Sequence, residues 1–342
     1  MPAATSRPAN KGRRWPDWLP QLSPFCHSDT RRALWQIVNS VGPYLLLWIL
    51  AVRCLETGAP WPVTGVILVL AACFLVRIFI LFHDCVHGSF FPSKKANTFF
   101  GYLFGLMVFT SFEDWQFAHL RHHATYANLD ARGFGDIWTM TVAEYRNASR
   151  WKRLGYRLYR HPLVLLGLGA LFNFLLHNRL PDRRARRQEA MSVILTNLLL
   201  VLIAMGVAAV IGWRAYLTIQ ILVLGLAGAM GIWLFYVQHQ FEGGYWARKE
   251  QWDPLRAAME GCSYYRLPAL LDWFSGHIGY HHIHHLKPRI PNYFLPACQQ
   301  AVPALAAKEP MTLRQSLSCA RVKLWDEQAG RMVDFSEVDQ RS

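Results

Sequence analysis

An apolar run leads directly into a pair of histidines in the stretch Ile78-Phe79-Ile80-Leu81-Phe82-His83-Asp84-Cys85-Val86-His87. The run closes an apolar segment, residues 62–82, that has about the 20 residues needed to cross a hydrocarbon core. One helix is therefore expected to cross a membrane and to continue beyond it, with His83 and His87 on one face a turn apart. Paired imidazoles at the end of such a helix indicate a metal site near the membrane surface.

Three other segments have the same length and apolar character: 33–55, 191–211 and 216–237. Charged residues make up only 17% of the chain, against about 25% in ordinary soluble domains. Two shorter apolar stretches, 99–110 and 163–176, favour interfacial or re-entrant helices over full crossings. We expect an all-α integral membrane protein with four transmembrane helices and a cytoplasmic helical cap that carries the histidine motifs.

Positive charge predicts the orientation of the four spans, because short cytoplasmic flanks accumulate lysine and arginine. Basic residues precede the first and third spans: Lys11, Arg13, Arg14, Arg31 and Arg32, and Arg179, Arg183, Arg184, Arg186 and Arg187. The turns within each pair of spans, 56–61 and 212–215, carry one charge each. Both termini are predicted to be cytoplasmic, and segments 83–190 and 238–342 then share one side. The net charge of +14 sits beside membrane spans, which favours contact with anionic headgroups over nucleic acid.

The chain reads as one membrane domain between two flanking segments. Residues 1–32 form a basic, proline-containing cytoplasmic segment without the features of a cleaved secretory signal. Residues 33–299 form the membrane domain, and 300–342 a cytoplasmic tail. The seven cysteines form no C-x-x-C pair and are expected to be reduced. Cys85 has two interpretations: a metal ligand, or a buried thiol that packs like a small apolar residue.

The pattern His-x-x-His-His occurs twice, at His119/His122/His123 and at His281/His284/His285. Residues i, i+3 and i+4 lie on one helix face, so each triplet is expected to turn three imidazoles toward one point. With His83 and His87 this gives eight candidate ligands, more than one metal needs, and predicts two transition-metal ions. His239, at the end of the fourth span, is a ninth candidate ligand. The alternative is a set of ordinary helix histidines or a tract that scavenges metal.

Carboxylates near these histidines do not show the Glu-x-x-His spacing of soluble di-iron bundles, so an all-histidine ligand set is expected. They would instead accept hydrogen bonds from the remote ring nitrogens, although Glu113 and Asp114 have the alternative of being solvated. The candidates are Asp84, Glu113, Asp114, Asp136 and Glu242. Hydrolysis needs only one zinc with three ligands. Eight or nine histidines favour dioxygen activation at two irons, which yields an oxidant able to break an unactivated C–H bond of a lipid tail.

The motifs resemble the three histidine boxes of membrane fatty acid desaturases: residues 83–91, 119–123 and 279–286. Four flanking segments, 133–139, 156–160, 238–243 and 288–293, are similar to those of the bacterial acyl-lipid branch, so that the resemblance covers about residues 33–335. It implies a di-iron, oxygen-dependent desaturase of the bacterial inner membrane that introduces a cis double bond into acyl chains of membrane glycerolipids. No cytochrome b5 signature His-Pro-Gly-Gly is present, so the resemblance also implies a separate electron donor, ferredoxin or a similar carrier.

Two further histidines adjoin the last box. His277 stands four residues before His281, where relatives commonly have Asn. On a helix it would bind iron directly or through a water, or donate a hydrogen bond beside the ligands. His282 points to a different helix face from its neighbours and is expected to be a bystander.

Two other functions fit parts of the same pattern. A di-iron lipid, alkane or carotenoid hydroxylase or ketolase would use the same oxidant and return oxygen to the carbon. A metal transporter or sensor would need ionisable residues deep inside the spans, where only Arg53 and Arg77 are candidates. The position of the new double bond, the lipid headgroup, the electron donor and the oligomeric state are not encoded in these motifs.

Overall fold

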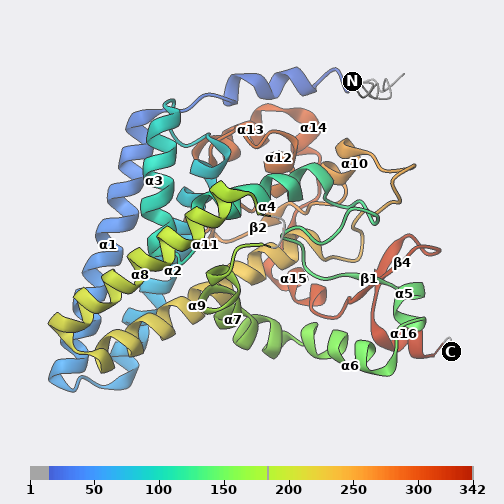
Figure 1. Cartoon of the computed structure of the whole chain (residues 1–342). Coiled ribbons are helices and arrows are strands. Elements are labelled where there is room, and N and C mark those ends of the chain that lie inside the picture. The colour runs from blue at the N-terminus through green and yellow to red at the C-terminus, as the bar shows by residue number, and fades with distance from the viewer. Residues whose placement is uncertain (1–14, 183–184, 341–342) are drawn as a thin grey trace, which may run out of the picture.

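The computed structural model of the protein describes residues 15–182 and 185–340. Four helices in the described residues are long and apolar enough to cross a membrane: α1 (Thr30–Thr57), α2 (Trp61–His87), α8 (Arg187–Ile211) and α9 (Trp213–His239). They lie together on the left of Figure 1, and the shorter elements gather at one end of them. The four predicted spans are confirmed, each within a somewhat longer helix.

Helix α2 is the centre of this bundle. Buried residues make up 56% of its most apolar stretch, against 17% in α1 and in α8. Its residues Leu75, Ile78 and Phe82 are almost fully buried between α1, α3 (Lys94–Met107) and α9. By contrast, α8 exposes large apolar side chains such as Ile194 and Val210, the pattern of a helix that faces lipid.

The α2 helix continues past the predicted span, as expected, and ends at His87. Gly88 adopts a left-handed conformation with φ +64°, and its backbone N–H donates to the carbonyls of Asp84 and Cys85. A side chain at this position would be strained, so glycine supports a helix end just after His87. The end of the span and the first histidine pair are therefore parts of one rigid element.

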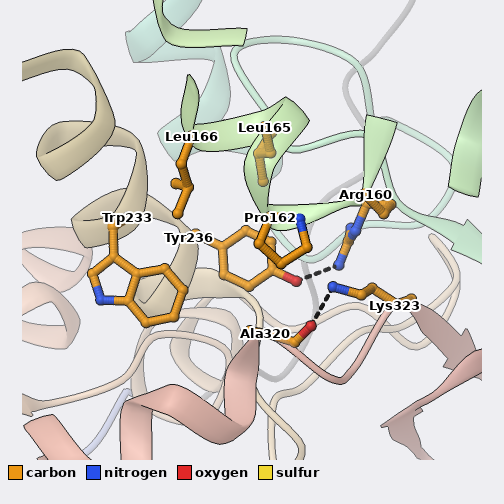
Figure 2. A pocket seen from close by; sticks show the side chains of 8 residues that line it. All are labelled: Arg160, Pro162, Leu165, Leu166, Trp233, Tyr236, Ala320 and Lys323. Carbon is orange, nitrogen blue, oxygen red and sulfur yellow. Dashed lines mark hydrogen bonds between the residues drawn. The ribbon is translucent and has the colours of Figure 1, made fainter. Parts of the chain in front are cut away.

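Short helices run between the second and third spans. Helix α3 covers the predicted 99–110 segment in part, and the predicted 163–176 segment folds as a π-helical turn η2 (Val164–Leu168) followed by α7 (Gly169–Leu175). A preceding helix, α6 (Arg150–Tyr159), meets η2 at an angle of 69°. The corner between them adjoins Arg160 and Lys323, and Figure 2 shows both side chains there. The interfacial placement of these helices stays a prediction.

The cap is built mainly from short helices. Beside η1 (Leu19–Phe25), it comprises α4 (Phe112–Thr125), α5 (Val142–Arg146), η3 (His177–Arg179), α10 (Pro254–Met259), α11 (Ala269–Phe274), α12 (His281–Leu286), η4 (Asn292–Phe294), α13 (Leu295–Ala301), α14 (Pro303–Ala306), α15 (Leu313–Cys319) and α16 (Phe335–Asp339). The fold is mostly helical, as predicted.

Two very small sheets join distant parts of the cap. Strand β1 (Met140–Thr141) pairs in parallel with β4 (Leu324–Asp326), which pairs antiparallel with β5 (Arg331–Val333). Strand β2 (Tyr265–Arg266) pairs in parallel with β3 (Met311–Thr312). Trp325 and Met332 then pack with Tyr126, directly after α4. Residues after 300 thus pack against the cap, while the division of the chain into three segments stays a prediction.

The cations used to predict orientation lie partly outside the described residues, namely Lys11, Arg13, Arg14, Arg183 and Arg184. Of the others, Arg31 and Arg32 are exposed in the first turns of α1, and the Arg186 side chain is 74% exposed just before α8. These positions fit basic flanks at the cap end of the spans. The orientation itself stays a prediction.

Candidate metal centre

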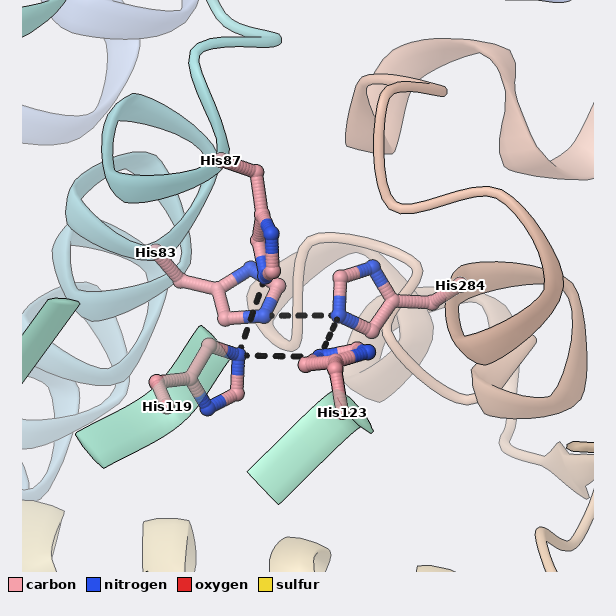
Figure 3. Close-up of side chains that lie close together, drawn as sticks. All are labelled: His83, His87, His119, His123 and His284. Carbon is pink, nitrogen blue, oxygen red and sulfur yellow. Dashed lines mark hydrogen bonds between the residues drawn. The ribbon is translucent and has the colours of Figure 1, made fainter. Parts of the chain in front are cut away.

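Histidines from four separate elements converge at the junction of the bundle and the cap. A first cluster consists of His83 and His87 at the end of α2, His119 and His123 on α4, and His284 on α12. Figure 3 shows their rings turned toward one another. Neighbouring Nε2 atoms are 3.0 Å apart between His83 and His284, and 2.9 Å apart between His284 and His123. Five imidazoles therefore surround one small volume.

A second cluster lies beside the first. It contains His239 at the end of α9, His281 and His285 on α12, and Cys262. His122 of α4 joins it, because its Nε2 atom is 3.2 Å from Nε2 of His239, which is 3.0 Å from Nε2 of His281. All nine predicted ligand residues thus lie in one of two adjacent groups.

The expectation that each triplet points to one place is wrong. On α4, His119 and His123 belong to the first cluster and His122 to the second. On α12 the division is reversed, because His281 and His285 belong to the second cluster and His284 to the first. Positions i and i+4 differ by about 40° around a helix, whereas i+3 and i+4 differ by about 100°. The i and i+4 rings therefore stay together and the i+3 ring turns to the neighbouring cluster.

The ring nitrogens that face away from the clusters show where the lone pairs of two histidines point, which is into the clusters. His122 Nδ1 lies 2.6 Å from Oδ1 of Asp136, and His83 Nδ1 lies 3.3 Å from Oδ1 of Asp84. A carboxylate can only accept, so in a neutral ring the proton sits on Nδ1 and Nε2 carries a lone pair. Lone pairs facing one another repel unless a cation lies between them. The two carboxylates confirm the predicted role for Asp84 and Asp136.

The spacing of the ring nitrogens fits metal ligation. Two ligands about 2.1 Å from a metal and at right angles to each other would be about 3.0 Å apart, as these nitrogens are. Nε2 of His285 is buried without a hydrogen-bond partner in the described part of the chain, and so is Nδ1 of His281. An all-nitrogen set of this kind suits iron, copper or zinc.

The environment keeps four of the cap histidines neutral. Burial, together with neighbouring imidazoles, holds the pKa of His119, His123, His281 and His284 well below the usual range. The neutral ring is the form that binds a metal, so these residues need lose no proton near pH 7.

Aromatic side chains and backbone contacts fix the ring positions. The indole of Trp115 stacks on His119 with ring centroids 4.2 Å apart. The Tyr126 hydroxyl is 3.1 Å from the carbonyl oxygen of His239 and 2.7 Å from that of Gly261. Packing of this kind limits the rotation of these rings.

Cys262 is the one member that the sequence analysis did not identify. Its Sγ atom is 3.8 Å from Nδ1 of His239, on the side of the ring away from His281. Burial raises the pKa of this thiol well above its usual value, so it is protonated in the absence of metal. No histidine stands next to it in the sequence, so no spacing indicated it. Cys85, in contrast, packs in the apolar core, in line with the second interpretation given to it.

Other residues near the boxes have different partners. Nδ1 of His277 is 2.6 Å from Oδ2 of Asp272, its φ is +60°, and it precedes α12, so the premise that a helix joins it to His281 is wrong. His282 is fully buried with its Nε2 3.0 Å from Oε1 of Gln299, as expected of a bystander. Among the described residues, neither belongs to a cluster.

The fold and site define a membrane protein whose cap presents two adjoining histidine clusters able to hold metal ions. The chain belongs to the fatty acid desaturase family, whose model matches residues 59–316, and is therefore an oxidoreductase of the desaturase type. It is 42% identical over 318 residues to a fatty acid desaturase of Bacillus subtilis, covering 93% of this chain and 90% of the relative.

More distant relatives carry more specific names. An sn-1 acyl-lipid omega-3 desaturase (ferredoxin) of Synechocystis is 25% identical, with 66% of this chain and 63% of that protein covered. An endoplasmic reticulum omega-3 fatty acid desaturase of Vigna radiata is also 25% identical, with 83% and 79% covered.

Proposed function

We propose that the protein introduces a cis double bond into acyl chains of membrane glycerolipids, using dioxygen and electrons from ferredoxin or a similar external carrier. Two hydrogens leave adjacent carbons, and with two further electrons and two protons they reduce dioxygen to two waters. The names of the relatives support this proposal, because one of them specifies an acyl-lipid substrate and ferredoxin. The protein would act in the bacterial inner membrane with both termini and the active site on the cytoplasmic side.

The convergence of imidazole nitrogens from α2, α4, α9 and α12 carries the proposal. We assign one iron to His83, His87, His119, His123 and His284, and a second iron to His122, His239, His281 and His285. When bound, two irons supply the activation of dioxygen that side chains cannot perform. The protein's own part is to hold nine imidazole rings in place.

The hydrogen bonds of two carboxylates to the ligand rings support the assignment of the irons. Asp136 and Asp84 hold protons on the remote nitrogens of His122 and His83, which leaves the inner nitrogens free to bind. The site lies at the ends of α2 and α9, and we propose that the lipid tail of the substrate reaches it there. Burial of that tail would contribute about 0.8 kcal/mol per methylene to substrate binding.

The test is to express the chain in a host that lacks polyunsaturated fatty acids and to analyse the lipids by mass spectrometry that localises double bonds. We expect a new double bond in glycerolipid acyl chains, accompanied by two irons per purified chain. A hydroxylated or ketone product would replace this proposal with the oxygenase alternative. The His284→Ala variant, which removes a ligand from the first cluster, serves as the inactive control.

A further inference from the structure

Two buried cations line a pocket that the proposed reaction does not use. The pocket lies where the corner between α6 and η2 meets the last turns of α9 and the segment after α15. Its free volume is about 10 Å³ as the side chains stand, so a ligand larger than a water enters only if the Lys323 side chain moves. Figure 2 shows Arg160 and Lys323 on one side of it, with the apolar side chains of Leu165, Leu166 and Trp233 around the rest.

Arg160 is charged, fully buried and surrounded only by uncharged acceptors. Its guanidinium donates to the Tyr236 hydroxyl at 2.9 Å, to Oε1 of Gln240 at 3.0 Å and to the carbonyl of Val322 at 3.2 Å. Its Nε is buried without a hydrogen-bond partner in the described part of the chain. An arginine with an unused buried donor and no carboxylate retains the capacity to bind an anion.

Lys323 adds a second unpaired charge to the same pocket. The residue is 7% exposed, and the hydrogen bond found for its ammonium group goes to the carbonyl of Ala320. Within residues 15–182 and 185–340, neither Lys323 nor Arg160 forms an ion pair with a carboxylate. Burial and the charge of Arg160 lower the pKa of Lys323 to about 8. Two buried like charges are unfavourable, and a bound anion would relieve both the repulsion and the desolvation.

The neighbouring helix indicates which source of anions the pocket faces. On α6 the side chains of Trp151, Leu154 and Leu158 are 69%, 47% and 54% exposed and lie on one face, opposite the buried Tyr156. The same helix carries basic residues, Arg150 beside that face and Lys152 and Arg153 on the other side of the helix. A helix with an exposed apolar face and basic residues lies in the membrane interface and attracts anionic lipids. The pocket follows directly after this helix, so a helix α6 bound at the interface would hold the pocket close to lipid phosphates.

We propose that this pocket binds the phosphate of a membrane phospholipid, with Nε of Arg160 and the Lys323 ammonium as donors. Leu165, Leu166 and Trp233 form the wall for the glyceride part. The four-carbon stem of Lys323 lets its ammonium leave the Ala320 carbonyl for the phosphate. This site goes beyond the proposed desaturation, since it involves neither the histidines nor a metal.

The experiment measures binding to the purified full chain in detergent by calorimetry. Three probes separate the sources: dihexanoyl phosphatidylglycerol, dihexanoylglycerol without phosphate, and inorganic phosphate. We expect the phospholipid to bind about tenfold or more tightly than either other probe. Lys323→Met should lower phospholipid affinity by about tenfold, and Lys323→Arg should retain it. Lys308→Met is the matched control, because Lys308 is likewise a partly buried lysine that donates to a carbonyl, that of Met259.

The outcomes separate clearly. Equal affinity for the phospholipid and for dihexanoylglycerol in the wild type would overturn the proposal without any variant. Equal affinity for inorganic phosphate would replace the lipid with a free anion as the occupant. Unchanged phospholipid affinity in Lys323→Met, or an equal loss in Lys308→Met, would remove Lys323 from the site. Calorimetry of lipid binding does not depend on iron content or turnover, so failure here leaves the proposed function standing.

Discussion

Replacing Asp136 by Asn tests whether a carboxylate sets the ligand form of His122. Oδ1 of Asp136 accepts from Nδ1 of His122 at 2.6 Å, and Oδ2 accepts from the backbone N–H of Gly133 at 3.1 Å. An asparagine can keep only one of these contacts. If the asparagine oxygen faces His122, the asparagine NH₂ group faces the Gly133 N–H, and two donors then oppose each other. If the amide is flipped, the asparagine NH₂ group donates to Nδ1 of His122. The flipped form moves the ring proton to Nε2 and blocks the metal-binding nitrogen.

The expected magnitude follows from the loss of this contact. Removal of a partner that orients a metal ligand typically weakens metal binding by about 10- to 100-fold, or about 1.4 to 2.7 kcal/mol. Because His122 belongs to the second cluster, Asp136→Asn should release one of the two irons to a chelator at a concentration that leaves the wild type fully loaded. Iron per chain, measured by elemental analysis after graded chelator treatment, provides the readout.

The control is Asp130→Asn, an identical change at an exposed carboxylate that binds Arg248 and lies in neither cluster. This variant should keep both irons at every chelator concentration that the wild type tolerates. If Asp136→Asn also keeps both, Asp136 does not control the protonation of His122. Loss of both irons together would indicate that the variant disrupts the cap as a whole.

Three further predictions address the ligands, the backbone and the lipid pocket. His284→Ala should abolish turnover and lower the iron content, whereas His282→Gln should keep both irons. Elemental analysis and product analysis of the two variants provide the comparison, and an active His284→Ala variant would remove His284 from the site. Gly279→Ala should destabilise the protein by about 1–3 kcal/mol or more, because a Cβ there would lie 2.2 Å from the carbonyl oxygen of the neighbouring strand β2. Gly155→Ala, in a helix with open space, should leave the thermal midpoint unchanged or raised, and equal midpoints for the two variants would contradict this reasoning. Lys323 is charged below its pKa of about 8, so the phospholipid affinity of the wild type should fall as the pH rises from 7 to 9.5. The affinity of Lys323→Arg should not fall over this range. A wild-type affinity that does not change with pH would refute the role of Lys323.

That pH dependence depends on what surrounds the lysine. The guanidinium of Arg160 disfavours the charged form of Lys323, and Asp334, on the side of α16, favours it. Tyr156 and Tyr236 also adjoin this group of charges, and burial raises the pKa of Tyr156, so that it stays neutral through the same pH range. Lys323 is thus the residue that changes charge between pH 7 and 9.5.

The sequence predicted the helices well because their signals are local. Length and apolar character were enough to identify all four spans, and the apolar run that leads into His83 indicated that this helix continues to His87. The strands were not predicted, since β1 and β2 are two residues long and exist only through pairing with residues far along the chain. Such short segments carry no periodic pattern of their own.

The sequence identified the histidines that the structure brings together, but not their arrangement. Eight histidines could be identified from their spacing, because helix geometry brings i, i+3 and i+4 to neighbouring positions. His239 was identified from its place at the end of the fourth span. How each triplet divides depends on where the other helices approach, and the sequence of α4 or α12 alone does not contain that information. Cys262 and the Asp272 partner of His277 were missed for the same reason, since both contacts arise from tertiary packing.

The division of both triplets has a consequence for metal uptake. Helices α4 and α12 each contribute to both clusters, so an ion bound in either one restrains both helices. The second ion then meets rings that are already ordered and loses less conformational entropy on binding. The two ions should therefore favour each other's binding, so a variant that has lost one ion should release the other at a lower chelator concentration than the wild type does.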